Sequence, residues 1–436
     1  MKYKNKNVLV YGMSVSGEWV TKLLLKLNAN VFLYDDDIEM LRRKNMSNCF
    51  FVNTVNETLI QEFDAIIVSP AIEKDNQVIA WACKYNVKVF SELEFSAQFC
   101  KKLVAITGTN GKTTTVELIT ALLNKKYKAI ACGNIGFPLS RAVLEKKSYI
   151  KVAEVSSFML EHCQTFSPHV ATVLNIEADH LIRHKTMEEY TKTKLNIFKN
   201  LKQTDYAVVN LDNNAHTPLE CLTLTYSYSH MADVRVKEGS IYLHNEKVID
   251  LNQLKIKGKH NIYNVMCAIC YAYIYKVKIE DIRNALINFV PASHRIESLG
   301  QVNGISFVND SKSTNIASTL ASTNTIKGSI ILLLGGSKKG LDYKKLFDKL
   351  NKRVTQVVAF GDIAQDLITA NMERFKIHKS KNLSSAFDYA VSVAKQNDTI
   401  LLSPASASYD EFNNYVERGK AFEQKVRNYE TKTKQK

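Results

Sequence analysis

A short glycine-rich loop between an apolar strand and a helix constrains the fold of this chain more than any other segment. Residues 103–106 have the character of a buried strand, and residues 114–123 that of a helix. The loop between them is Thr107-Gly108-Thr109-Asn110-Gly111-Lys112-Thr113. Its glycines allow backbone N–H groups to approach phosphate oxygens, and the start of the helix adds a favourable dipole. This order of elements predicts an α/β fold that binds a nucleotide phosphate.

The side chains of the loop also suit a phosphate site. Lys112 supplies a positive charge for the outer phosphates, and Thr113 supplies a hydroxyl for Mg²⁺. The usual phosphate-binding pattern has its first glycine five residues before the second, but Ile106 occupies that position here. The generic pattern therefore fails, and G-T-N-G-K-T-T stands in its place. A purely structural turn is the alternative, and the placement of Gly, Lys and Thr argues against it.

Strands and helices alternate in three segments, and 436 residues are enough for about three domains. Residues 1–95 begin with a strand, a Gly12-to-Gly17 turn and a helix, which is typical of a Rossmann-like domain. Residues 96–291 contain the glycine-rich loop and form a central mononucleotide-binding α/β domain. Residues 292–436 form a third α/β domain, also Rossmann-like, and we expect its Lys/Gln-rich tail after Asn428 to fray.

Composition and charge exclude several classes of protein. The net charge is +15, but the basic residues are scattered, so a lysine-rich composition explains it better than nucleic-acid binding. No apolar run approaches the roughly 18 residues of a membrane span, and the basic start lacks the apolar region of a signal peptide. We expect a cytoplasmic protein with no nucleic-acid or membrane partner. Cys267 and Cys270 lie in an apolar helix at 261–275, which favours reduced, buried thiols over a zinc site.

Six further motifs follow the glycine-rich loop along the chain. They are Glu154-Val155-Ser156-Ser157-Phe158, Asn175-Ile176-Glu177-Ala178-Asp179-His180, Tyr190-Thr191-Lys192-Thr193-Lys194, Gly258 to Asn264, His294-Arg295 and Asn309-Asp310-Ser311-Lys312. In this order, and together with G-T-N-G-K-T-T, they resemble the Mur ligases, which are ATP-dependent, amide-forming enzymes with three domains. The folylpolyglutamate synthetases share the loop, but they begin directly with it. The roughly 95 residues that precede it here argue against them.

The resemblance implies a reaction in which ATP phosphorylates a carboxylate and an amine then attacks the acyl phosphate. It implies ATP contacts for Gly108, Thr109, Asn110, Gly111, Lys112, Thr113, Thr114, Asn261, Asn264, Arg295 and Asp310. Two amides on an apolar helix, Asn261 and Asn264, could instead be structural. The implied catalytic residues are Lys112, Glu154, His180 and Lys194.

The same resemblance implies Mg²⁺ ligands. Thr113 and Glu154 would bind a Mg²⁺ that bridges ATP, and His180 would bind a second one, although a lone histidine is more often structural. Lys194 matches a lysine that is carbamylated in the family and becomes an anionic ligand. From spacing alone, Lys194 would be a solvated helix lysine.

Within the family, Ser69-Pro70, the short chain and E-V-S-S-F are most similar to members that add D-glutamate to UDP-N-acetylmuramoyl-L-alanine in peptidoglycan synthesis. The first turn and Asp35 alone would suggest a dinucleotide, whereas the resemblance implies a UDP-linked substrate. The implied contacts to that substrate are Ser14, Val15, Ser16, Asp35, Ser69, Asn134, Ser156 and Ser157. A D-glutamate pocket is implied at Lys312, Thr314, Lys339, Ser408 and Tyr415, where cations and hydroxyls suit a dicarboxylate. Lys338 is the alternative to Lys339.

Several positions depart from the family pattern. Ser14 replaces a glycine, Ala71 replaces a glycine, Met159 replaces a glutamine, Ile182 replaces an acidic residue and Tyr415 stands where phenylalanine is common. We expect a monomeric ligase that uses ATP and Mg²⁺. Its rivals are an L-alanine-adding member, a lysine- or folate-directed ligase, an inactive descendant and a nucleotide-binding switch that ligates nothing. The ordered motifs in the second and third segments argue against the switch, which needs no amino-acid pocket.

Overall fold

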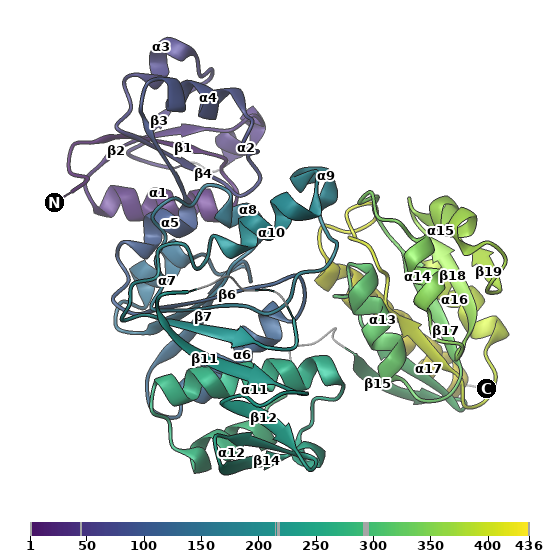
Figure 1. The fold of residues 1–436 in the computed structure, drawn as a ribbon. Coiled ribbons are helices and arrows are strands. Elements are labelled where there is room, and N and C mark those ends of the chain that lie inside the picture. The colour runs from purple at the N-terminus through teal and green to yellow at the C-terminus, as the bar shows by residue number, and fades with distance from the viewer. Residues whose placement is uncertain (1, 44–45, 214, 216–218, 291–295, 435–436) are drawn as a thin grey trace. The chain divides into compact units, whose positions relative to one another are not determined.

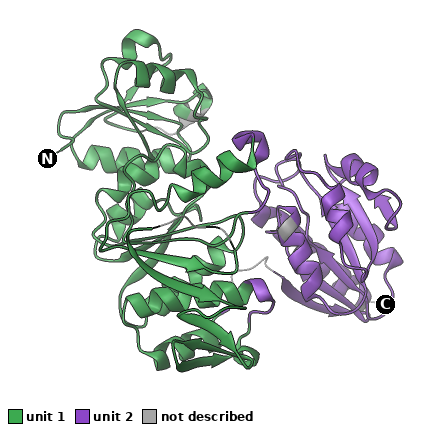
Figure 2. Ribbon diagram, viewed as in Figure 1, with its two compact units in different colours: residues 1–176, 186–255, 261–289 green, residues 177–185, 256–260, 290–436 purple. Residues whose placement is uncertain are grey.

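The computed structural model describes residues 2–43, 46–213, 215, 219–290 and 296–434. They divide into two compact units, shown in Figure 2. Unit 1 comprises Met1–Ile176, Thr186–Lys255 and Asn261–Phe289, and unit 2 comprises Glu177–Lys185, Ile256–His260 and Val290–Lys436. Three sheets alternate with helices along the chain, as Figure 1 shows, so the predicted α/β class is confirmed. The predicted domain boundaries at residues 95 and 291 stay a prediction.

The first sheet, in unit 1, is parallel throughout and has the strand order β3-β2-β1-β4-β5. Its strands are β1 (Asn7–Tyr11), β2 (Asn30–Tyr34), β3 (Phe50–Phe51), β4 (Ala65–Val68) and β5 (Lys88–Ser91), and its helices are α1 (Val15–Lys26), α2 (Ile38–Arg43), α3 (Glu57–Ile60), α4 (Gln77–Lys84) and α5 (Glu92–Ala97). Successive side chains of β1 enter cores on opposite faces, because side chains alternate along a strand. Val8 and Val10 pack with Leu24 of α1, whereas Leu9 packs with Ile79 of α4.

The second sheet, also in unit 1, carries the glycine-rich loop. Its order is β14-β13-β12-β11-β10-β9-β6-β8-β7. The strands are β6 (Leu103–Thr107), β7 (Ala129–Gly133), β8 (Ile150–Glu154), β9 (Val170–Val173), β10 (Tyr206–Asn210), β11 (Leu222–Ser227), β12 (Val234–Lys237), β13 (Ser240–Leu243) and β14 (Glu246–Asp250). All five residues of β6 are buried, as expected for a central parallel strand covered on both faces.

The helices of the middle segment begin with α6 (Lys112–Leu123), which follows the loop directly. The others are α7 (Leu139–Glu145), α8 (Ser157–Leu160), α9 (Leu181–His184), α10 (Met187–Leu195), the 3₁₀ helix η1 (Leu251–Gln253), α11 (Lys259–Ile274) and α12 (Ile279–Asn288). Cys267 and Cys270 are buried free thiols on α11, as predicted. Within the described ranges, no helix is long and apolar enough to cross a membrane.

The third sheet, in unit 2, has the order β15-β16-β20-β17-β18-β19, and only the β15–β16 pair is antiparallel. Its strands are β15 (Glu297–Val302), β16 (Ile305–Asn309), β17 (Ile330–Gly335), β18 (Val354–Phe360), β19 (Ile377–Lys379) and β20 (Thr399–Leu402), and its helices are α13 (Ile316–Thr325), α14 (Lys344–Lys349), α15 (Ala364–Asn371), α16 (Leu383–Val393) and α17 (Tyr415–Lys434). Leu332 packs with α14 and α15, whereas Leu333 packs with α16 and α17 on the opposite face.

The C-terminal segment corrects one prediction. The tail after Asn428 was expected to fray, but α17 continues to Lys434. Its apolar side chains explain the extension, because Phe422 and Val426 are buried and the Tyr429 ring lies 6.0 Å from that of Phe307.

We predict that Tyr429→Ala lowers the free energy of unfolding by about 1–2 kcal/mol, because it removes an aromatic contact from a packed face. Lys432→Ala, on the exposed side of the same helix, is the matched control and should change stability little. Urea denaturation of the three proteins measures the difference. Equal stability of all three would contradict the packing of this last turn.

Candidate active site

The glycine-rich loop adopts a backbone conformation that requires its glycines. Gly111 has φ +82° and stands immediately before α6, and Gly108 has φ +152°. A Cβ atom on Gly111 would lie 2.5 Å from Oδ1 of Asn264, a buried side chain of α11. The Lys112 ammonium donates to the carbonyl oxygens of Gly108 and Thr109, at 2.8 Å each. The carbonyl groups of the loop therefore hold the Lys112 ammonium at the carboxyl end of β6.

Asn175 fixes the loop from β9, the neighbouring strand. Its Oδ1 accepts a hydrogen bond from the Asn110 N–H at 2.8 Å, and its Nδ2 donates to the Asn110 carbonyl at 3.1 Å. The Asn175 carbonyl also accepts from the Thr109 N–H at 3.0 Å. Asn175 opens one of the sequence motifs but was not predicted as a site residue, because only the fold shows that it brackets the loop.

Thr113, Glu154 and Asn134 meet beside the loop. The Thr113 hydroxyl donates to Glu154 Oε2 at 2.5 Å, and Asn134 Nδ2 donates to Glu154 Oε1 at 3.1 Å. Glu154 ends β8 and is 4% exposed. A carboxylate and a hydroxyl are oxygen donors of the kind that Mg²⁺ prefers, so this pair fits the predicted metal. The described residues contain no group of three or more His, Cys, Asp or Glu side chains arranged for a metal.

Lys194 is buried against the same loop. Lys194 lies on α10 and is 1% exposed, and its Nζ donates to the Gly108 carbonyl at 2.9 Å. The Nζ also lies 4.7 Å from the centre of the Tyr190 ring, whose hydroxyl is 3.2 Å from that of Thr109. The solvated helix lysine that spacing alone favoured is therefore wrong. Carbamylation of Lys194 stays a prediction. Tyr190 opens the same sequence motif but was not predicted as a site residue.

The predicted adenine contacts lie at the start of α11. Asn264 Nδ2 donates to Asn261 Oδ1 at 3.1 Å, so each amide satisfies part of the other's hydrogen-bonding capacity. Because Asn264 also faces Gly111, the amide pair adjoins the loop. This position agrees with a nucleotide contact, which stays a prediction.

The residues predicted to contact the UDP-linked substrate lie mostly at the carboxyl edge of the first sheet. The Ser14 and Ser69 hydroxyls are 3.3 Å apart, and Asp35 Oδ2 accepts from the Met13 N–H at 2.6 Å. Val15, beside Ser14, is 52% exposed, and Ser16 is half-buried. In the second sheet, Ser156 caps α8 and Ser157 is buried, while Asn134 is already engaged with Glu154. Their contacts to a substrate stay predictions.

In unit 2, Lys339 and Asp179 form a nearly buried ion pair. Lys339 Nζ donates to Asp179 Oδ1 at 3.0 Å and to the Thr314 carbonyl at 3.3 Å, and Asn315 Nδ2 donates to Asp179 Oδ2 at 3.3 Å. Burial opposes ionisation of Asp179, but Lys339 and the adjacent His180 outweigh it and hold the pKa of that carboxyl below its ordinary value. Asp179 was missing from the predicted site, although its motif was noted.

The geometry separates the two candidate lysines. The Lys338 side chain is 66% exposed and lies 3.6 Å from Asp366, whereas the Lys339 side chain is 13% exposed and turns inward. His180 adopts a left-handed conformation with φ +54° at the start of α9. His180 belongs to unit 2, and Glu154 and Lys194 belong to unit 1. The roles of these three residues as ligands of two Mg²⁺ ions therefore stay predictions.

The remaining predicted amino-acid ligands surround the carboxyl edge of the third sheet. Lys312 Nζ lies 5.0 Å from the centre of the Tyr415 ring, and the Ser311 hydroxyl donates to the Tyr415 carbonyl at 2.8 Å. Ser408 is 2% exposed, and its carbonyl accepts from the Phe412 N–H at 2.8 Å. The fold thus assembles the pairs Lys312–Tyr415 and Thr314–Lys339, which are far apart in sequence.

Asp310, a predicted ATP contact, is deeply buried in unit 2. Its Oδ2 accepts from the Ser322 and Ser403 hydroxyls at 2.6 and 2.7 Å, and burial raises the pKa of its carboxyl. These bonds favour a role in organising the loops, and its contact with ATP stays a prediction. Arg295 and the adjacent His294 lie outside the described residues.

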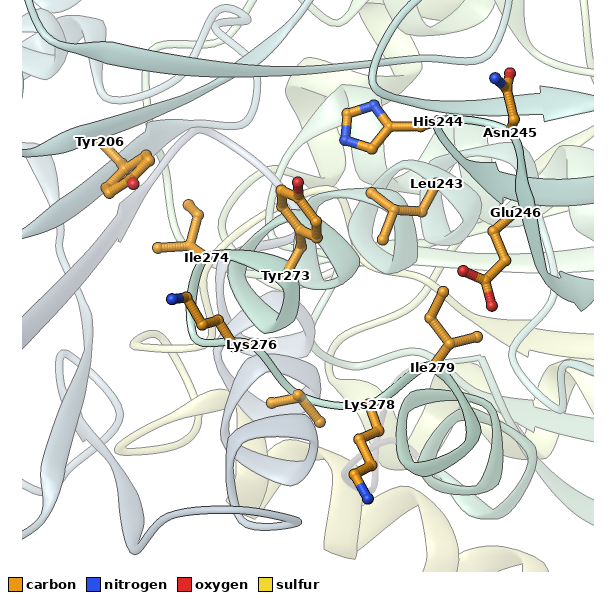
Figure 3. A pocket seen from close by; sticks show the side chains of 11 residues that line it. Tyr206, Leu243, His244, Asn245, Glu246, Tyr273, Ile274, Lys276, Lys278 and Ile279 are labelled. Carbon is orange, nitrogen blue, oxygen red and sulfur yellow. The ribbon is translucent and has the colours of Figure 1, made fainter.

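A cavity of about 930 Å³ lies elsewhere in unit 1, between the β13–β14 turn and the loop joining α11 to α12 (Figure 3). The rings of His244 and Tyr273 stand 5.3 Å apart in its wall. Among the residues that the structure describes, none of the predicted site residues lines this cavity. Lys276 and Lys278 on one wall oppose Glu246 on another, so its charges indicate no single class of ligand.

Known proteins are similar to this chain in both sequence and fold. The model of the Mur ligase middle domain matches residues 106–272, and that of the Mur ligase, glutamate ligase domain matches residues 294–406. The UDP-N-acetylmuramoylalanine--D-glutamate ligase of Thermoanaerobacter pseudethanolicus is 34% identical over 98% of this chain and 99% of its own. The chain therefore belongs to the Mur ligase family, as the sequence motifs indicated.

Solved structures agree at the level of the fold. A pseudomurein peptide ligase type C from Methanothermus fervidus superposes with a TM-score of 0.62 at 18% identity, covering 97% of this chain and 100% of its own. The MurF ligase of Thermotoga maritima, solved in complex with ADP, superposes with a TM-score of 0.60 at 17% identity, covering 98% and 96%. The three-sheet α/β architecture is thus a known arrangement.

We predict that Gly111→Ala weakens nucleotide binding about tenfold or more, because its Cβ would displace the Asn264 side chain from the loop. Gly239→Ala is the matched control, since Gly239 also has a positive φ, +73°, but its Cβ would meet nothing within 4 Å. Both variants place an alanine at a positive φ, but only the first disturbs Asn264. Isothermal titration with ATP measures the difference; similar affinities for the two variants would contradict this role of Gly111.

Proposed function

We propose that this protein is the ligase that joins D-glutamate to the carboxylate of UDP-N-acetylmuramoyl-L-alanine, with conversion of ATP to ADP and phosphate. The observation that carries the proposal is similarity to relatives of that name over 98% of the chain, which includes both the phosphate loop and the third sheet. The loop geometry supports the use of ATP, and the Lys339 site supports an anionic amino acid.

The phosphate loop serves the first half of the reaction. The substrate carboxylate attacks the γ-phosphorus of ATP, the bond to the β-phosphate oxygen breaks, and an acyl phosphate and ADP result. Lys112 neutralises phosphate charge, and the backbone N–H groups of residues 108–111 orient the phosphates. Thr113 and Glu154 would hold a Mg²⁺, which neutralises phosphate charge further when bound.

Lys194 and His180 complete the proposed catalytic set. Lys194 Nζ lies at the Gly108 carbonyl, beside the phosphate loop, and carbamylation would convert a buried cation there into an oxygen ligand. His180, in the segment that follows β9, would be a ligand of a second Mg²⁺. Both roles rest on the family resemblance together with the position of each residue.

The second half of the reaction needs a bound amino acid with a free amine. The amine attacks the acyl carbon, a tetrahedral intermediate forms, and phosphate leaves as the amide bond is completed. We assign the carboxylates of D-glutamate to Lys339 and Lys312, because each would receive a charge-assisted hydrogen bond there. Thr314, Ser408 and Tyr415 complete this pocket, and Ser14, Val15, Ser16, Asp35, Ser69, Asn134, Ser156 and Ser157 would contact the UDP-linked substrate.

We predict that phosphate release from ATP and Mg²⁺ requires both UDP-N-acetylmuramoyl-L-alanine and D-glutamate. L-Glutamate, L-alanine and L-lysine, assayed in parallel, should give no release, because the relatives that carry the proposal are named for D-glutamate. Mass spectrometry should find a product heavier by one glutamyl residue. Release with a different amino acid would keep the mechanism and reject the substrate. No release with any of them, from protein that binds ATP, would reject the ligase function.

Lys339→Met should lower kcat/KM for D-glutamate about 10- to 100-fold, since one charge-assisted hydrogen bond contributes about 1.5–3 kcal/mol. Lys338→Met is the matched control, because Lys338 is adjacent but exposed, and it should stay within about twofold of wild type. Steady-state kinetics with varied D-glutamate measure both. A larger effect at Lys338 would reverse the assignment of the two lysines.

A further inference from the structure

Arg418 stands out in unit 2 because a charged side chain is completely enclosed there. It is 1% exposed and projects from the first turns of α17. Burial lowers the pKa of its guanidinium to about 10, so the group is charged at neutral pH. Later apolar side chains of the same helix, Phe422 and Val426, already anchor α17 to the sheet.

The guanidinium joins three loops at the carboxyl edge of the third sheet. Nε and Nη2 donate to the hydroxyl and carbonyl oxygens of Ser311, at 3.1 and 2.9 Å, in the loop after β16. Nη1 donates to Gly335 at the end of β17, at 3.3 Å, and to Ala407 after β20, at 3.1 Å. Nη2 also donates to the Ser406 carbonyl at 3.0 Å. One planar group thus fixes the relative positions of three chain segments.

Each of these segments leads into a residue of the proposed amino-acid pocket. Ser311 precedes Lys312, Ala407 precedes Ser408, and the loop from Gly335 leads to Lys339. The loops also approach too closely for other side chains. A Cβ on Gly336 would lie 1.9 Å from the Ala407 carbonyl and 3.0 Å from Arg418 Nη1.

We propose that Arg418 is a positioning residue that sets the spacing of Lys312, Lys339 and Ser408 for the amino-acid substrate, which rests on the proposed function. Stability alone does not explain this arginine, because well-packed apolar residues usually replace a buried charge without loss of stability. A fork of donors aimed at loop carbonyls, by contrast, fixes the loops to each other in one geometry. Arg418 itself touches neither substrate nor reacting atoms.

The experiment compares wild type, Arg418→Lys, Ser311→Ala and Arg427→Lys. We expect Arg418→Lys to raise KM for D-glutamate about tenfold or more, because misplacement by about 1 Å is enough for such losses. The KM values for ATP and UDP-N-acetylmuramoyl-L-alanine should change by less than about twofold. Ser311→Ala, which removes one acceptor of the guanidinium, should raise only the D-glutamate KM and by less. Arg427, exposed on the same helix, is the control and should match wild type.

An unchanged KM for D-glutamate in folded Arg418→Lys would overturn the proposal, and so would an equal rise of all three KM values. If Arg418→Lys fails to fold, an unchanged D-glutamate KM in Ser311→Ala overturns it. The same assay with wild type tests the proposed function separately. If wild type ligates another amino acid, the KM for that amino acid is compared instead of the KM for D-glutamate. If wild type ligates no amino acid, the test is hydrogen exchange of the backbone amides, compared between Arg418→Lys and wild type. Faster exchange at residues 311–314, 336–340 and 406–408 together supports positioning, and unchanged exchange rejects it.

Discussion

Loops that follow parallel strands emerge at one edge of a sheet, and each site in this protein depends on that constraint. In the second sheet, β6, β8 and β9 lie side by side, so the loop residue Lys112, the strand-end residue Glu154 and Asn175 after β9 come together. In the third sheet, β16, β17 and β20 are neighbours, and their following loops meet at Arg418. Strand order, more than any single contact, decides which side chains can act together.

The sites also contain charges that water does not solvate. Lys194, Asp310 and Arg418 are each nearly or fully buried, and each makes hydrogen bonds that compensate for lost hydration. The acceptors of Lys194 and Arg418 include main-chain carbonyls. Such acceptors do not change their protonation as the pH changes. Hydrogen bonds to main-chain carbonyls compensate for the cost of burial. Because these carbonyls are in place only when the backbone follows one path, the geometry of each site depends on the fold.

The local parts of this architecture could be predicted from sequence. The strand before the glycine-rich loop, the helix after it and the hydroxyl of Thr113, which we propose as a Mg²⁺ ligand, are neighbours in the chain, so spacing alone places them. Parts that depend on distant pairing could not. Asn110 meets Asn175 across 65 residues, Arg418 meets Ser311 across 107, and Lys339 meets Asp179 across 160. Spacing alone indicated a solvated Lys194 for the same reason, because its neighbours in sequence are lysines while its neighbour in space is Gly108. The tail was misjudged because its polar composition hides the apolar stripe that ends at Tyr429.

The carbonyl oxygen of Gly108 accepts hydrogen bonds from two ammonium groups, those of Lys112 and Lys194, at 2.8 and 2.9 Å. The two nitrogens are therefore within about 6 Å of each other, where like charges repel by about 3 kcal/mol at an effective dielectric constant near 20. A phosphate group placed between them would turn this repulsion into attraction, and so would a negative charge added to Lys194. An anion bound between them would therefore be attracted by both ammonium groups at once.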